Sequence, residues 1–159
     1  MYIEVKPNMD DLPSSVADDL AIRTLCHRFS HCVISRDAQA FRACWTEDGV
    51  WDIGAPMNVH LVGADAITEG FTHLMATWEF FVQMPHAGVV EVVGNRATSS
   101  WVMNEVGKPV QQPGQPQKGH LNYSTYTDEL VRENGVWRFG LRRYRFLYLD
   151  ETPLAGQVL

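Results

Sequence analysis

Apolar residues near the start of the chain recur at the spacing of an α-helix. One face of a helix over residues 16–34 would hold Ile22, Leu25, Cys26, Phe29 and Val33. Ser15, with Asp18 three residues later, predicts the N-terminal cap of this helix. The polar, mixed residues 1–14 are expected to form an extended lead-in to a single domain of residues 15–159.

The next stretch alternates short helical and strand patterns. Asp37 predicts the cap of a second, short helix, whose apolar face would hold Phe41, Cys44 and Trp45. Strand-like runs at 50–53 and 59–62 follow, with turn residues between them. A third helix is predicted over residues 64–78, where apolar residues again recur at helical spacing.

The second half of the chain has the alternation and β-branched content of strands. Four strands are predicted at 88–93, 97–106, 120–132 and 136–149. Asn134-Gly135 is a hairpin signal, because both residues tolerate positive φ, whereas the proline- and glutamine-rich segment 108–119 predicts a flexible loop. Helices grouped before an antiparallel sheet indicate an α+β fold. A strongly curved sheet covered by helices leaves a conical apolar pocket, which is typical of ligand sites.

Composition narrows the classes of function. Hydrophobic residues make up 45% and charged residues 20% of the 159, which is typical of a globular domain rather than a disordered chain. The net charge of −6 argues against a nucleic-acid partner. The chain has neither an apolar run of about 18 residues nor an apolar secretory signal, so no membrane partner is expected. Three cysteines without CxxC spacing favour reduced thiols and a cytoplasmic location.

Candidate polar residues follow from strand alternation. Trp101, Met103 and Glu105 share one strand face, and if this face is concave, Glu105 is a carboxylate in an apolar cavity. On the next strand Asn122 and Tyr126 share a face with His120, Ser124 and Asp128, and this polar row could face either solvent or a ligand.

The sequence signals for an inward arginine, a metal site and a cofactor are weaker. Arg142 alternates against Trp137, Phe139 and Leu141, so only a β-bulge would turn it inward. His27 and His31 have a metal-compatible spacing, but no third ligand is evident and no metal site is expected. Phosphate-binding and nucleophile-elbow motifs are absent from the sequence, so no cofactor is expected.

Several motifs together resemble a known family. They are Ala21-Ile22-Arg23, Arg36-Asp37 followed by residues 45–51, His86 ahead of a strand that ends at residues 94–97, the run 126–139, and the tail 152–156. This combination resembles the SnoaL-like group of the nuclear-transport-factor-2-like superfamily, which includes lindane dehydrochlorinase, scytalone dehydratase and bile-acid 7α-dehydratase. The resemblance implies a cone-shaped α+β (cystatin-like) fold, with three N-terminal helices packed on a curved antiparallel sheet.

The resemblance also implies a site in which a histidine base works with an aspartate. His86 matches the family histidine, whereas the family aspartate position is Ile34 and the polar position five residues earlier is Phe29. Glu105, on the strand that carries a second catalytic carboxylate in the bile-acid dehydratase, is the first candidate to replace the aspartate. Arg142 matches a cavity arginine of the dehydrochlorinase.

The remaining expectations concern the substrate and the reaction. The predicted cavity wall is Phe29, Ile34, Trp51 and Met103, and the predicted groups for a developing oxyanion are Asn122, Tyr126 or Arg142. The leading hypothesis is a cofactor-independent lyase of the dehydratase or elimination type, acting on a small hydrophobic, ring-containing substrate. The alternatives are an isomerase or cyclase using the same cavity, and a non-catalytic ligand-binding or assembly domain like the small subunits of ring-hydroxylating dioxygenases. By the resemblance, the chain is expected to form a homo-oligomer, a dimer or a trimer.

Overall fold

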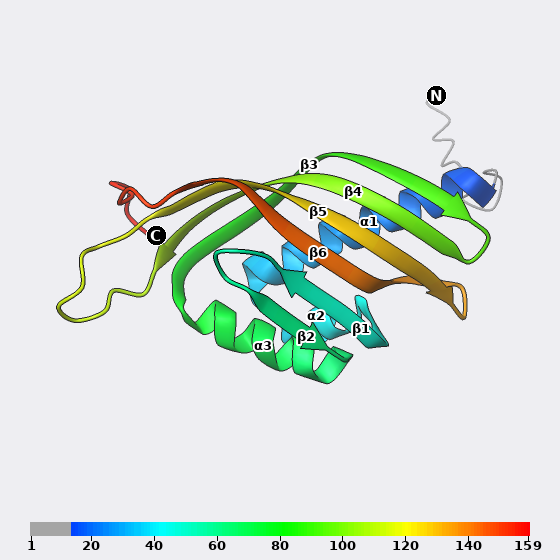
Figure 1. Ribbon diagram of the computed structural model, residues 1–159, viewed down its shortest axis with the longest axis horizontal. Helices are drawn as coiled ribbons and strands as arrows, with labels where there is room; N and C mark the ends of the chain where they lie inside the picture. The colour runs from blue at the N-terminus through cyan, green and yellow to red at the C-terminus, as the bar shows by residue number, and fades with distance from the viewer. Residues whose placement is uncertain (1–13) are drawn as a thin grey trace, which may run out of the picture.

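The computed structural model describes residues 14–159 as helices packed on one curved sheet (Figure 1). The elements in chain order are α1 (Ser14–Ser35), α2 (Ala38–Arg42), β1 (Trp45–Ile53), β2 (Val59–Val62), α3 (Ala64–Ala76), β3 (Trp78–Val93), β4 (Arg96–Pro109), β5 (His120–Glu133) and β6 (Val136–Asp150). The α+β prediction is confirmed. Positions 1–13 of the predicted lead-in lie outside the described residues. Ser14 already belongs to α1, so Ser15, the predicted cap, lies inside the first turn.

The six strands form one sheet in the order β2-β1-β6-β5-β4-β3. The last four strands are an antiparallel meander, as the alternation in the sequence predicts, and β1 joins β6 in parallel. The β5–β6 turn has positive φ at Asn134 (51°) and Gly135 (80°), which confirms the predicted hairpin. Asp37 caps α2 by accepting a hydrogen bond from the backbone N–H of Ala40 at 2.9 Å, also as predicted.

The strand β3 is longer than the sequence predicts. The third helix ends at Ala76, and β3 begins at Trp78, ten residues before the predicted strand. Trp78 and Phe81 continue the helical spacing of the preceding apolar residues, so periodicity alone extends the helix. The extra length of β3 brings new side chains onto the concave face of the sheet.

The core lies between α1 and the concave face of the sheet. Phe29 of α1 is fully buried, and its ring packs edge-on against Trp51, Tyr126 and Phe139, with centroids 5.7–6.1 Å apart. The α1 side chains at every third or fourth position are buried, which confirms the predicted helix face. This aromatic layer closes one end of the cone and leaves the other end for a cavity.

Candidate functional site

A small cavity lies under the concave face, between the sheet, α3 and the β1–β2 turn. Its volume is about 50 Å³. Aromatic and aliphatic side chains form most of its wall: Trp51, Ile53, Met57, Leu74, Trp78, Phe81, Tyr126 and Phe146. Four polar side chains complete it: Gln83, Glu105, His120 and Tyr144. An apolar pocket with a few convergent polar groups is the usual form of a ligand site.

The Glu105 carboxylate is the centre of the polar wall. Its Oε1 accepts a hydrogen bond from Gln83 Nε2 at 2.6 Å. Its Oε2 accepts hydrogen bonds from Asn122 Nδ2 at 2.7 Å and from the Tyr144 hydroxyl at 2.6 Å. The three donors are uncharged, and among residues 14–159 no arginine or lysine forms an ion pair with Glu105. Strand alternation correctly placed Glu105 on the buried face together with Trp101 and Met103.

His120, at the start of β5, lies beside this carboxylate. Its Nε2 is 3.6 Å from Glu105 Oε2 and 2.7 Å from Asn122 Nδ2. The imidazole packs edge-on against Trp78, with ring centroids 5.0 Å apart, and also contacts Phe81. An imidazole and a carboxylate therefore line the same apolar space, which is the pairing that general acid–base chemistry needs.

The two tyrosines of the wall remain protonated. Burial, and then the negative charge of Glu105, raise the pKa of Tyr144 well above its usual range. Burial likewise raises the pKa of Tyr126, and the positive charge of Arg142 opposes this rise. Tyr144 therefore stays a hydrogen-bond donor to Glu105 throughout the physiological pH range, and Tyr126 accepts a hydrogen bond from Trp51 Nε1 at 3.3 Å.

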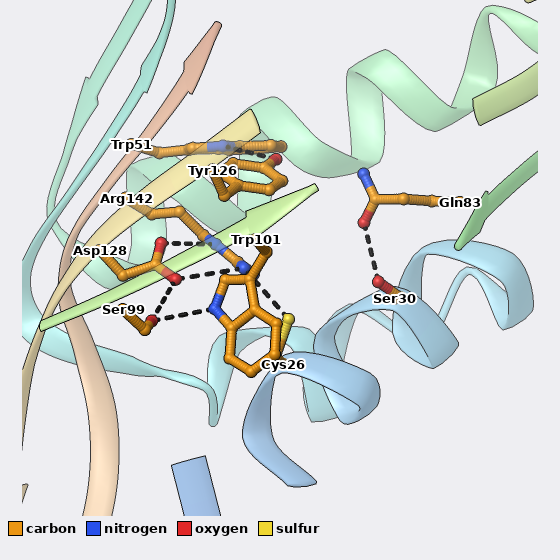
Figure 2. Close-up of polar contacts among 9 residues, drawn as sticks. All are labelled: Cys26, Ser30, Trp51, Gln83, Ser99, Trp101, Tyr126, Asp128 and Arg142. Carbon is orange, nitrogen blue, oxygen red and sulfur yellow. Dashed lines mark hydrogen bonds and ion pairs between the residues drawn. The ribbon is translucent and has the colours of Figure 1, made fainter. Parts of the chain in front are cut away.

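The helix α1 supports the carboxylate through β3. Figure 2 shows Ser30 of α1 directed toward Gln83, and its hydroxyl donates to Gln83 Oε1 at 3.1 Å. Both side chains are buried. Because the amide oxygen of Gln83 faces Ser30, its amide nitrogen faces Glu105, so this contact orients the donor to the carboxylate.

Arg142 takes part in a separate buried cluster (Figure 2). Its Nε donates to Asp128 Oδ1 at 2.9 Å, and both side chains are completely buried. The Ser99 hydroxyl donates to Asp128 Oδ2 at 2.8 Å and accepts from Trp101 Nε1 at 2.9 Å. The guanidinium carbon lies 3.9–4.2 Å from the ring centroids of Phe29, Tyr126 and Phe139. Arg142 is therefore committed to the core and does not line the cavity.

A β-bulge in β6 turns the Arg142 side chain inward. Strand alternation alone would place this side chain on the outer face, so the sequence predicts that an inward Arg142 requires such a bulge. Leu130 pairs with Phe139, but the preceding residue Glu129 pairs with Leu141, so Gly140 is an extra residue in β6. The inward direction is confirmed, whereas the structure gives no support to a role for Arg142 in the cavity.

His86 lies outside the cavity, so the predicted placement of the base is wrong. Pro85 pairs with Met103 and Gly88 with Trp101, so His86 and Ala87 together oppose the single residue Val102. This bulge leaves the His86 side chain exposed, without a hydrogen bond or ion pair to any residue in the described range 14–159. Gln83, three residues earlier, occupies the concave face instead.

The other predicted wall residues divide into three groups. Trp51 and Tyr126 line the cavity, and fully buried Asn122 lies within hydrogen-bond distance of three residues of its wall. Phe29 and Met103 are completely buried in the core and are not among the lining residues. Ile34 is 45% exposed, so its predicted place in the wall is wrong.

The structure also reveals lining residues that the sequence interpretation missed. Gln83, His120 and Tyr144 were absent from the predicted site. A signal existed for His120, because it shares the strand face of Asn122 and Tyr126. None existed for Gln83, since its segment had the spacing of a helix end and a connecting loop.

No metal-holding group of three or more His, Cys, Asp or Glu side chains occurs in the described part of the chain. His27 and His31 are exposed on α1. Burial raises the pKa of the Cys44 thiol to about 12 and also raises that of Cys26, so these thiols stay protonated.

No helix within residues 14–159 is both long and apolar enough to cross a membrane.

Solved structures with the same fold include several enzymes. A hexachlorocyclohexane dehydrochlorinase, LinA type 2, superimposes with a TM-score of 0.78 at 20% identity, covering 91% of this chain and 94% of its own. A candidate scytalone dehydratase from Novosphingobium aromaticivorans gives 0.76 at 15% identity, covering 91% and 98%. A candidate aromatic ring hydroxylase from the same organism gives 0.77 at 23% identity, covering 89% and 96%.

These likenesses show the shared fold, and fold alone does not determine activity. No curated protein matches the sequence significantly. The sequence profile of the SnoaL-like domain matches residues 14–143, which span the three helices, strands β1 to β5 and the first half of β6. This chain therefore belongs to the SnoaL-like domain family.

Proposed function

We propose that this protein is a cofactor-independent lyase in which Glu105 and His120 carry out proton transfer. The substrate is a small, largely apolar, ring-containing molecule that loses water, a halide or a small carbonyl fragment. The observation that carries the proposal is the Glu105 carboxylate, which lines an apolar cavity next to an imidazole and is held only by neutral donors.

The cost of burying the Glu105 carboxylate supports this proposal. Removing a carboxylate from water costs several kcal/mol even after relaxation, which a nearby cation usually offsets. Here three hydrogen bonds offset part of this cost, and the nearest basic group is His120. An apolar pocket with a few convergent polar groups is the usual form of a ligand or active site.

The geometry also leaves room for a substrate proton. Each carboxylate oxygen can accept about two hydrogen bonds. Oε2 of Glu105 accepts two from the protein, but Oε1 accepts only the one from Gln83 in the described structure. Oε1 therefore keeps one acceptor direction for a proton on the substrate.

A non-catalytic ligand-binding domain is the second candidate. Its support is that the two positions expected to carry the histidine–aspartate pair, His86 and Ile34, are both exposed. An isomerase or cyclase would use the same proton transfer without a leaving group, so the reaction products alone separate it from a lyase.

Assembly into a homo-oligomer is also part of the proposal. Met84, Tyr123 and Tyr148, each 38–53% exposed, lie in one row across the outer sheet face, in which Asn104 of β4 stands between Met84 and Tyr123. A second copy that covered this row would remove apolar surface from water.

The test is a screen of aromatic, polyketide and steroid-like compounds by thermal shift and turnover. Glu105→Gln should keep binding but lose at least about 100-fold in turnover, within the usual contribution of a positioned base. Exposed Glu129→Gln is the matched control and should behave as wild type. Full turnover by Glu105→Gln would contradict the role of Glu105, and compounds that bind without any turnover would favour the binding domain.

A further inference from the structure

Asn122 connects the two groups of the proposed proton-transfer pair. It is completely buried on β5, two residues after His120. Its Nδ2 is 2.7 Å from Glu105 Oε2 and 2.7 Å from His120 Nε2, and its Oδ1 lies 3.0 Å from the Tyr144 hydroxyl oxygen, whose single hydrogen is donated to Glu105.

The carboxylate fixes which way the Asn122 amide faces. An ionised carboxylate only accepts hydrogen bonds, so the group that faces it at 2.7 Å must be the NH₂ group. The opposite orientation would place Oδ1 against Oε2, and two acceptors repel each other. One amide hydrogen therefore points to Glu105, and the second is directed to His120 Nε2.

A donated hydrogen requires a lone pair on the atom that accepts it. His120 Nε2 must then be unprotonated, and a neutral imidazole with a free Nε2 carries its hydrogen on Nδ1. The alternative tautomer would set an Nε2–H against the N–H of Asn122. We infer that Asn122 is a positioning residue that fixes neutral His120 in the Nδ1–H tautomer.

This inference rests on the proposed function for its chemical meaning. With its proton on Nδ1, His120 supplies a hydrogen-bond donor, and Glu105 Oε1 is left as the proton acceptor. The site then suits a substrate whose acidic C–H is next to a carbonyl group. This assignment reverses the roles that the sequence predicted, in which a histidine was the base.

Glu105 and His120 together account for every proton that moves in the proposed elimination. Glu105 Oε1 takes the proton, the C–H electron pair forms the C=C bond of an enolate, and the carbonyl π pair moves to the oxygen, which is hydrogen-bonded to His120 Nδ1–H. When the C=O bond re-forms, the enolate π pair forms a C=C bond to the next carbon, and the C–O bond between that carbon and the leaving hydroxyl breaks. The departing hydroxide takes the proton back from Glu105 and leaves as water. His120 keeps its proton throughout, so no imidazolate forms.

The test is the two-bond ¹H–¹⁵N spectrum of the full-length, ¹⁵N-labelled protein without substrate, at about pH 8, above the ordinary histidine pKa of about 6.5. The signals of His120 are identified by their loss in His120→Gln. We expect wild type to show a protonated Nδ1 and an unprotonated Nε2. In Asn122→Ala we expect the proton to move to Nε2, because only Glu105 then faces that nitrogen.

Tyr144→Phe is the matched control, because it alters the same network but keeps both hydrogens of Asn122. It should leave the His120 tautomer unchanged. A wild-type ring protonated on Nε2, an unchanged tautomer in Asn122→Ala, or a switch in Tyr144→Phe would each overturn the inference. If Asn122→Ala does not fold, the wild-type spectrum still decides. Since this measurement uses no substrate, its outcome is separate from the turnover test of Glu105.

Discussion

Two buried carboxylates on the concave face of the sheet differ in how they are neutralised. Asp128 and Glu105 are 3% and 5% exposed, on the neighbouring strands β5 and β4. Asp128 forms an ion pair with Arg142, whose guanidinium group is enclosed by aromatic rings. Glu105 has three neutral donors and faces a cavity.

This difference separates a structural role from a functional one. Neither Asp128 nor Arg142 lines the apolar cavity, and their opposite charges offset each other, while Arg142 Nη1 has no hydrogen-bond partner among the described residues. Glu105 keeps an acceptor direction and a neighbouring imidazole that the fold itself does not require. Burial of a charge is therefore a weaker guide to function than the combination of burial, missing cation and adjoining cavity.

The largest expected effect is on stability, at Asp128. Asp128→Asn removes the charge that pairs with fully buried Arg142, so we expect a loss of about 3–5 kcal/mol in the free energy of unfolding. Glu105→Gln should lose less, about 1–3 kcal/mol, because its new NH₂ group faces a donor where the carboxylate had an acceptor. Equilibrium urea unfolding of both variants measures the difference. Equal losses would remove the distinction between the two carboxylates.

A smaller effect is expected on the binding of ring compounds, when the mouth of the cavity is widened. Met57 lines the cavity from the β1–β2 turn and is 39% exposed, so Met57→Ala widens the entrance without emptying the core. We expect dissociation constants for ring compounds to fall several-fold, measured by calorimetric titration. Val102→Ala, at an exposed position of β4 that does not line the cavity, is the control and should leave these constants unchanged. Weaker binding in Met57→Ala would show that Met57 contacts the ligand rather than blocks it.

The smallest effect is expected at His86. Its side chain is exposed beyond a bulge and belongs to neither carboxylate cluster, so His86→Ala should keep turnover within about twofold of wild type. Steady-state kinetics on any compound from the screen measures this. A tenfold loss would return His86 to the mechanism and weaken the case for Glu105 and His120.

The sequence predicts most of the fold because periodicity reports burial directly. Alternation placed Glu105 on the same face as Trp101 and Met103, which the structure shows to be buried. For Arg142, strict alternation predicts the face opposite Phe139, and only the bulge at Gly140 turns this side chain inward. The bulge at His86–Ala87 gave no comparable signal. Gly88 is needed there because a Cβ would lie 2.1 Å from the Trp101 ring, and this contact depends on the partner strand, not on local sequence.

The site was less predictable than the fold for a related reason. One extra residue in β3 decides whether His86 or Gln83 faces inward, and a single-residue shift reverses the faces of a strand. His120 was visible as a member of a polar row, but only the positions of β4 and β6 show that this row meets Glu105 and Tyr144. Packing between strands, rather than the pattern within one strand, assembles the candidate site.

The size of the cavity has a kinetic consequence. An enclosed space of about 150 Å³ accepts a benzene ring, whereas the cavity here, which opens to solvent on one side, measures only about 50 Å³. A ring can enter only while the side chains at the entrance are turned aside, so the apparent affinity is the intrinsic affinity multiplied by the populated fraction of that open state. Ligands should therefore associate more slowly than collision allows, and saturation of the association rate at high ligand concentration would report the opening rate itself.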